Sequence, residues 1–182
     1  YLDTPGPRDQ YLTNFTFSLD GRSAYVAVLN RDQNDMKLNA YDSKSGRMLL
    51  TLIEETSDIY VEPEHPPIFV KGNPGRFLWY SERDGYNQLY LYSTDGKLLR
   101  KLTEGSYDVL DIWGFANGGR TAIVKTTEGL MGEAVMTIDL ENGKTKKITK
   151  EEGAYSGAVQ PGGDLLMIRQ RSMTVPNLVV IT

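Results

Sequence analysis

The sequence predicts an all-β fold, namely a partial β-propeller of about four four-stranded antiparallel blades. Two patterns that repeat in phase carry this prediction, and no segment combines a sustained 3.6-residue period with helix caps. The first pattern is a Gly, then Arg or Asp, one variable residue, and three apolar or small residues. It begins at Gly21, Gly75, Gly119 and Gly163, at intervals of about 45 to 55 residues, a period typical of propeller blades.

The second pattern is a short strand followed by a polar turn that contains Gly and then a basic residue. A strand that ends in an Asx-Gly turn is a strong hairpin signal. The second strand of each predicted unit, such as 77–80, is nearly all apolar, which fits burial on both faces by neighbouring sheets. A β-sandwich with a repetitive sequence is the alternative. The copies of the second pattern are 38–42 with Gly46-Arg47, 89–93 with Gly96-Lys97, 135–139 with Gly143-Lys144, and 178–182, where the sequence ends before the turn.

These repeats divide the sequence into a leading segment and a propeller. We expect residues 1–10 to form a linker or an incomplete preceding blade and residues 11–182 to form the propeller segment. The sequence opens at Tyr1 without a signal-like stretch, so we expect a piece of a longer protein. Open end blades would expose apolar faces, which predicts a homodimer. The expected blades are 11–56, 57–105, 106–152 and an incomplete 153–182.

Composition excludes several classes of protein. The 182 residues include 24 acidic and 20 basic side chains, with a net charge of −4 and no basic stripe. Nucleic acid and anionic membranes are therefore not expected partners. No apolar run approaches the roughly 18 residues of a membrane span, and without cysteine there are no disulfides or thiolate metal sites.

The residues present do not predict catalysis, a metal site or a cofactor. The sequence lacks a Gly-x-Ser-x-Gly nucleophile elbow, and its one histidine, His65, leaves a Ser-His-Asp triad without candidates. The run 32–35 is typical of calcium loops, but Met36 and Lys37 replace a ligand and the Gly. We interpret His65 as structural or exposed, and the Asn14-Phe15-Thr16 glycosylation pattern as a coincidence within a first strand.

Charged pairs and tyrosines also have a structural interpretation. We expect the glutamate pairs 54–55 and 151–152 to be solvated at strand ends or in loops. Most tyrosines fall in strands, at positions that predict burial within or between blades: Tyr25, Tyr41, Tyr80, Tyr90 and Tyr92. Three others fall in predicted loops and are candidates for surface contacts: Tyr60, Tyr86 and Tyr107.

Segments 81–92, 29–34 and 63–66 resemble the propeller of the dipeptidyl peptidase IV family, within the prolyl oligopeptidase clan. In that family an eight-bladed N-terminal propeller sits over a C-terminal α/β-hydrolase domain and the protein removes N-terminal dipeptides with Pro or Ala second. The resemblance implies the later half of such a propeller, which is itself non-catalytic. It would wall and gate the cavity for a peptide substrate, with the hydrolase domain in cis, in a serine dipeptidyl peptidase.

The resemblance also places one candidate site and a compartment. Residues Tyr60, Val61 and Glu62 match, in position rather than in residue type, a family loop that reaches the substrate pocket, so they are expected at its rim. The family's paired glutamates would lie in an earlier blade. A bacterial periplasmic or extracellular location is implied. The alternatives are a stand-alone propeller that acts as a binding or scaffold module and an independent propeller enzyme. The enzyme ranks last because the strands expected nearest the axis offer mainly aromatic residues: Phe15, Phe17, Trp113 and Phe115.

Overall fold

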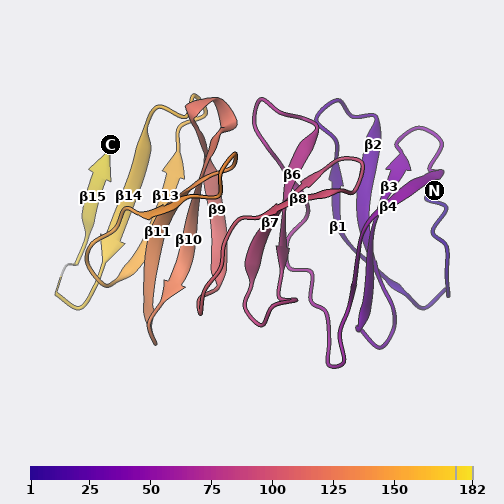
Figure 1. Cartoon of the computed structure of the whole chain (residues 1–182), viewed down its shortest axis with the longest axis horizontal. Helices are drawn as coiled ribbons and strands as arrows, with labels where there is room; N and C mark the ends of the chain where they lie inside the picture. The colour runs from indigo at the N-terminus through magenta and orange to yellow at the C-terminus, as the bar shows by residue number, and fades with distance from the viewer. Residues whose placement is uncertain (175, 182) are drawn as a thin grey trace. The chain divides into compact units, whose positions relative to one another are not determined.

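The computed structural model describes residues 1–174 and 176–181, which form four antiparallel sheets and one short 3₁₀ turn, Asn117–Gly119 (Figure 1). The predicted fold class, an all-β partial propeller of about four blades, is confirmed. The expected blade bounds and the assignment of residues 1–10 stay predictions. Val175 and Thr182, both in the predicted fourth blade, lie outside the described residues.

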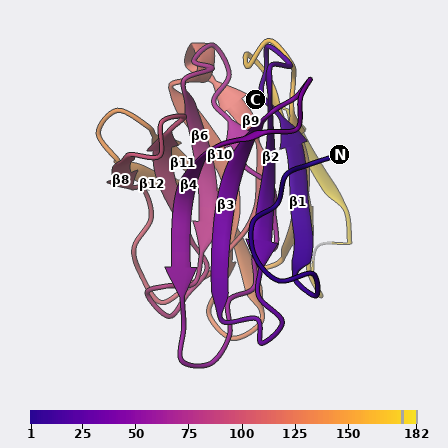
Figure 2. The ribbon, with the colours of Figure 1, turned by 90° about the vertical axis from the view of Figure 1, so that its right-hand side faces the viewer.

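The chain divides into two compact units, one of residues 1–85 and 90–99 and the other of residues 86–89 and 100–182. The first unit contains a sheet in the order β1-β2-β3-β4, whose strands lie side by side in Figure 2. The next sheet has the order β5-β6-β7-β8. The strands are β1 (Tyr11–Phe17), β2 (Ser23–Leu29), β3 (Asp35–Asp42), β4 (Met48–Thr56), β5 (Ile68–Phe69), β6 (Arg76–Ser81), β7 (Gln88–Ser93) and β8 (Leu98–Lys101).

The core of the first unit lies between two stacked sheets. Strand β2 is buried from Ala24 to Leu29, and β6 from Phe77 to Ser81, as the apolar second-strand pattern predicts. On the face of β2 away from the second sheet, Ala24 and Val26 cluster with Tyr41, Leu2 and Met48. The cluster between the sheets joins Tyr25, Met36, Leu38, Ile53, Phe77, Trp79, Tyr90 and Tyr92, among others. All five tyrosines expected in the core are buried.

Two elements of the first unit depart from the simple repeat. Strand β4 spans nine residues and its pairing with β3 shifts register twice, whereas the repeat predicts a short fourth strand. Strand β1 contains a bulge between Thr13 and Thr16, where Asn14 has a φ of +53°. Residues 1–10 form no strand, but Leu2 packs on Ala24 and its neighbours, and the Asp3 N–H donates to the Gly46 carbonyl at 2.8 Å.

The second unit contains a sheet in the order β12-β11-β10-β9 and a three-stranded sheet, β13-β14-β15. In its core, Ile123 of β10 and Val135 of β11 pack against Tyr155 of β13 and Leu166 of β14. The fourth repeat shows no outer strand among the described residues, and β15 is exposed along its length. The strands are β9 (Val109–Ala116), β10 (Thr121–Glu128), β11 (Gly132–Asp139), β12 (Thr145–Lys147), β13 (Ala154–Val159), β14 (Leu166–Arg171) and β15 (Leu178–Ile181).

The sequence Lys-x-Thr recurs at the ends of two outer strands, at 101–103 for β8 and at 147–149 for β12. The Thr103 hydroxyl accepts a hydrogen bond from the Leu89 N–H at 2.9 Å, and the Thr149 hydroxyl accepts one from the Val135 N–H at 3.1 Å. Both threonines are buried. Their side chains satisfy an N–H of the third strand where the fourth strand has ended, which avoids the cost of an unpaired buried donor.

Candidate functional site

A pocket of about 250 Å³ opens in the first unit between the β4–β5 connection and the β6–β7 hairpin. Its lining brings together the three residues predicted from sequence, Tyr60, Val61 and Glu62, with the end of β4 and the end of β6. Tyr60 is 53% exposed and Glu62 is exposed, whereas Val61 packs against the core cluster. The pocket therefore presents one aromatic ring and one carboxylate on a loop whose middle residue is anchored.

The loop that carries these residues is tied to the first sheet by its backbone. The Ser57 N–H donates to the Asn34 carbonyl at 3.0 Å, and the Val61 N–H donates to the Gln33 carbonyl at 2.7 Å. The Asn14 side-chain amide donates to the Pro63 carbonyl at 2.6 Å. Asn14 and Gln33 both have positive φ, at +53° and +57°. Such conformations cost energy outside glycine and persist where the surroundings hold them, so the loop has a defined path.

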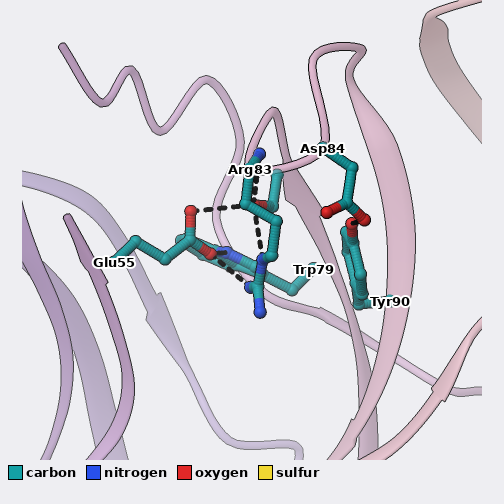
Figure 3. Close-up of polar contacts among 6 residues, drawn as sticks. Glu55, Trp79, Arg83, Asp84 and Tyr90 are labelled. Carbon is teal, nitrogen blue, oxygen red and sulfur yellow. Dashed lines mark hydrogen bonds and ion pairs between the residues drawn. The ribbon is translucent and has the colours of Figure 1, made fainter. Parts of the chain in front are cut away.

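Behind the loop lies a hydrogen-bonded cluster centred on Glu55 (Figure 3). One carboxylate oxygen, Oε1, accepts from the Trp79 indole N–H at 2.9 Å and from Arg83 Nη2 at 2.5 Å. The other, Oε2, accepts from the Ser81 hydroxyl at 2.8 Å. The Glu55 side chain is only 9% exposed. A buried carboxylate is tolerated when it is both paired with a cation and hydrogen-bonded, and Glu55 meets both conditions.

Arg83 is fixed by aromatic rings as well as by Glu55. Its guanidinium lies 4.4 Å from the centre of the Tyr90 ring, and the Tyr90 hydroxyl donates to Asp84 at 2.6 Å (Figure 3). Burial alone would lower the pKa of Arg83, but the charges of Glu55 and Tyr92 outweigh it and raise that pKa. Burial, followed by the contact with Asp84, raises the pKa of Tyr90. Arg83 therefore stays a cation beside a neutral Tyr90 phenol near neutral pH.

The solvated interpretation of the glutamate pairs is wrong for Glu55. Glu54 is 61% exposed and lies 3.8 Å from Lys37, as a solvated charge should. Its neighbour Glu55 points to the other face because side chains alternate along a strand. In the register of β3 and β4, Glu55 lies opposite Met36, which is fully buried. This pairing is the signal that sequence reasoning missed. The other pair, at 151–152, is exposed as expected.

The remaining candidates have structural contacts. The His65 ring packs against the Tyr80 ring at a tilt of 36°, with the ring centroids 4.4 Å apart. Asn14 of the glycosylation pattern uses its side-chain amide inside the fold. Tyr86 is exposed and Tyr107 partly buried. Within the described residues, no group of three or more His, Cys, Asp or Glu side chains could hold a metal ion, and no helix is long and apolar enough to cross a membrane.

Comparisons with known proteins place this geometry in a family context. The family model for the dipeptidyl peptidase IV (DPP IV) N-terminal region matches residues 1–177. A crystal structure described as a dipeptidyl aminopeptidase IV from Bacteroides ovatus is 30% identical, with a TM-score of 0.91 over 100% of this chain. Porphyromonas gingivalis dipeptidyl peptidase 4 is 25% identical, with a TM-score of 0.86 over 99%.

The chain spans only part of these relatives, 29% of the Bacteroides ovatus chain and 25% of the Porphyromonas gingivalis chain. A third structure, TolB from Acinetobacter baumannii, matches with a TM-score of 0.62 over 93% of this chain and 40% of its own. Its identity of 16% shows a likeness of fold alone.

Proposed function

Because the chain belongs to the dipeptidyl peptidase IV N-terminal region family, we propose that it is a non-catalytic propeller segment of a serine exopeptidase. The intact protein would remove N-terminal dipeptides with Pro or Ala in the second position. The family match over residues 1–177 carries this proposal. The sequence contains no Gly-x-Ser-x-Gly elbow, and its one histidine packs against the ring of Tyr80. A C-terminal α/β-hydrolase domain in cis, which the family suggests, would supply the nucleophile.

The role of this segment would be to wall and gate the cavity over the hydrolase domain. A shaped, partly closed cavity admits short peptides, excludes folded chains and orders the substrate near the nucleophile. The pocket rim of Tyr60, Val61 and Glu62 supports this role, because two exposed side chains of complementary chemistry stand on a loop held by three hydrogen bonds. Tyr60 would contact apolar parts of a peptide, and Glu62 its cationic groups.

The open reading frame that contains the chain gives the first test. A Gly-x-Ser-x-Gly motif downstream of Thr182 is expected, whereas its absence would favour a stand-alone propeller that binds partners as a scaffold. A Gly-Pro chromogenic substrate should show no turnover with residues 1–182 alone and clear turnover with the full protein. Activity in residues 1–182 alone would overturn the non-catalytic assignment.

The rim is tested in the full protein by Tyr60→Ala. We expect a rise in KM with little change in kcat, because a rim contact contributes to binding rather than to the chemical step. Tyr11→Ala is the matched control, since Tyr11 is also a surface tyrosine of the first unit but lies outside the pocket lining. Equal effects of the two substitutions would remove the rim from the proposal. The periplasmic or extracellular location, proposed from the family alone, is tested by cell fractionation.

A further inference from the structure

Asx-Gly turns in this chain differ in one chemical respect. Five glycines follow an Asn or Asp, and four of them donate their backbone N–H to a carbonyl at 2.7 to 2.9 Å. The fifth, Gly118, follows Asn117 at the start of the 3₁₀ turn, where N–H groups have no partner within the helix. The preceding residue, Ala116, makes no side-chain capping bond. The four bonded pairs are Gly21 with Ser18, Gly85 with Glu82, Gly96 with Ser93, and Gly143 with Asp139.

A free Gly N–H after Asn is a nucleophile placed beside an amide carbon. The Gly118 nitrogen can attack Cγ of Asn117, which forms a ring bond and breaks the Cγ–Nδ2 bond. The side-chain nitrogen Nδ2 leaves as ammonia and takes with it the proton of the Gly118 N–H. Water then opens the cyclic imide at either carbonyl and yields aspartate or isoaspartate. Water is the only co-reactant, and no oxidation state changes.

The surroundings of Asn117 leave room for this reaction. Asn117 and Gly118 are both exposed, with φ of +52° and +65°. A Cβ built on Gly118 would meet nothing within 4 Å, so no neighbouring group crowds this residue. The Asn117 amide donates from Nδ2 to Thr121 Oγ1 at 3.0 Å, a bond that leaves its Cγ open to attack.

The other Asn-Gly pair is held in place. The Asn142 N–H donates to Asp139 Oδ1 at 3.2 Å, and Asn142 Oδ1 accepts from the Lys144 N–H at 2.8 Å. The Gly143 N–H donates to the Asp139 carbonyl at 2.7 Å. Attack by this nitrogen requires that its hydrogen bond first break, and a Cβ at Gly143 would already meet the Arg100 side chain at 3.1 Å.

We propose that Asn117 is a site of spontaneous covalent modification, where the side-chain amide converts to aspartate and isoaspartate through a cyclic imide with Gly118. Conversion replaces the donor to Thr121 by a carboxylate and adds one negative charge to the β9–β10 turn. The isoaspartate form also lengthens the backbone of that turn by one methylene, which a turn of this size cannot absorb without opening.

The experiment follows both Asn-Gly pairs in one sample. The folded chain is incubated at mildly alkaline pH in oxygen-labelled water, digested, and read by peptide mass spectrometry, so that labelled acid marks conversion before digestion. Asn117 should convert about five to ten times faster than Asn142, the factor given by one backbone hydrogen bond that must first break. In concentrated urea the two rates should become similar. Equal rates in the folded chain would overturn the proposal.

A capping variant tests the cause. Ala116 has extended backbone at the N-cap position, so Ala116→Ser supplies a hydroxyl that can accept the N–H of Gly118. This variant should slow conversion of Asn117 several-fold and leave Asn142 unchanged. A normal rate in Ala116→Ser would contradict the role assigned to the free N–H.

Discussion

Removal of the Glu55 carboxylate should destabilise the first unit far more than removal of its neighbour. Glu55→Ala leaves the Trp79 indole N–H without an acceptor inside a fully buried environment, at a cost of about 1–3 kcal/mol. It also removes the carboxylate partner of Arg83, but that side chain is 30% exposed, so water compensates part of the lost ion pair. We expect a total of about 3–4 kcal/mol, near the lower range for a broken buried pair.

Glu54→Ala is the matched control, because it removes the same group one position earlier on β4. Its ion pair with Lys37 joins two exposed side chains, so the expected loss is below about 1 kcal/mol. Trp79 in the first unit and Trp113 in the second are the two tryptophans of the chain. A Trp113→Phe background therefore lets the fluorescence of Trp79 report unfolding of the first unit in urea.

Two outcomes would refute the reasoning. A loss for Glu55→Ala no larger than that for Glu54→Ala would mean that the cluster contributes no net stability. A double-mutant cycle with Arg83→Met should give a coupling free energy of about 1 kcal/mol or more, because the residues share a network. Strict additivity would show that Glu55 acts through Trp79 and Ser81 alone.

Three further predictions concern alkaline pH, strand packing and association. Burial and Asp84 raise the pKa of Tyr90 above its ordinary value of 10.0. The neutral phenol therefore contributes its stability in full below about pH 10, and this contribution is lost as the pH rises through the raised pKa. Tyr90→Phe should reduce the loss of urea stability at alkaline pH, and an unchanged loss would contradict the assignment to Tyr90. Gly157→Ala would place a Cβ 2.3 Å from the Met167 carbonyl and 2.6 Å from the Trp113 ring, so thermal unfolding followed by Trp113 fluorescence should show a loss of about 1–3 kcal/mol; an unshifted midpoint would mean that the strand moves aside freely. The exposed apolar side chains of β15 predict concentration-dependent dimers in light scattering, and a monomer at high concentration would contradict this.

The fold could be predicted from sequence because its signals are local and repeated. A Gly-Arg turn or an Asx-Gly turn sets a strand boundary through a few neighbouring residues, and four copies in phase make the period visible. The buried second strands followed for the same reason, since an unbroken apolar run such as 77–80 needs cover on both faces.

The site was predictable only in part, because its chemistry depends on register. Sequence places Glu54 and Glu55 side by side and does not show which of the two faces the core. The pairing of β3 with β4 separates them, since it sets one opposite Lys37 and the other opposite Met36. Asn14 is a similar case: a bulge in β1 changes its direction and brings its amide to Pro63, a residue 49 positions away.

The buried threonine hydroxyls at the ends of two outer strands bear on how such a chain can diverge. The hydroxyls of Thr103 and Thr149 make the last hydrogen bond between the third and fourth strands of their sheets. The outer strand is therefore fully paired before the chain crosses to the next sheet. The last pairing of the outer strand is made by the threonine rather than by the residues that follow it. The crossing after Thr103 is itself held by buried Gln88, whose Nε2 donates to the carbonyls of Gly105 and Tyr107. Changes of length in the crossings that keep such bonds should therefore leave the outer strands in place while giving the crossings new surfaces.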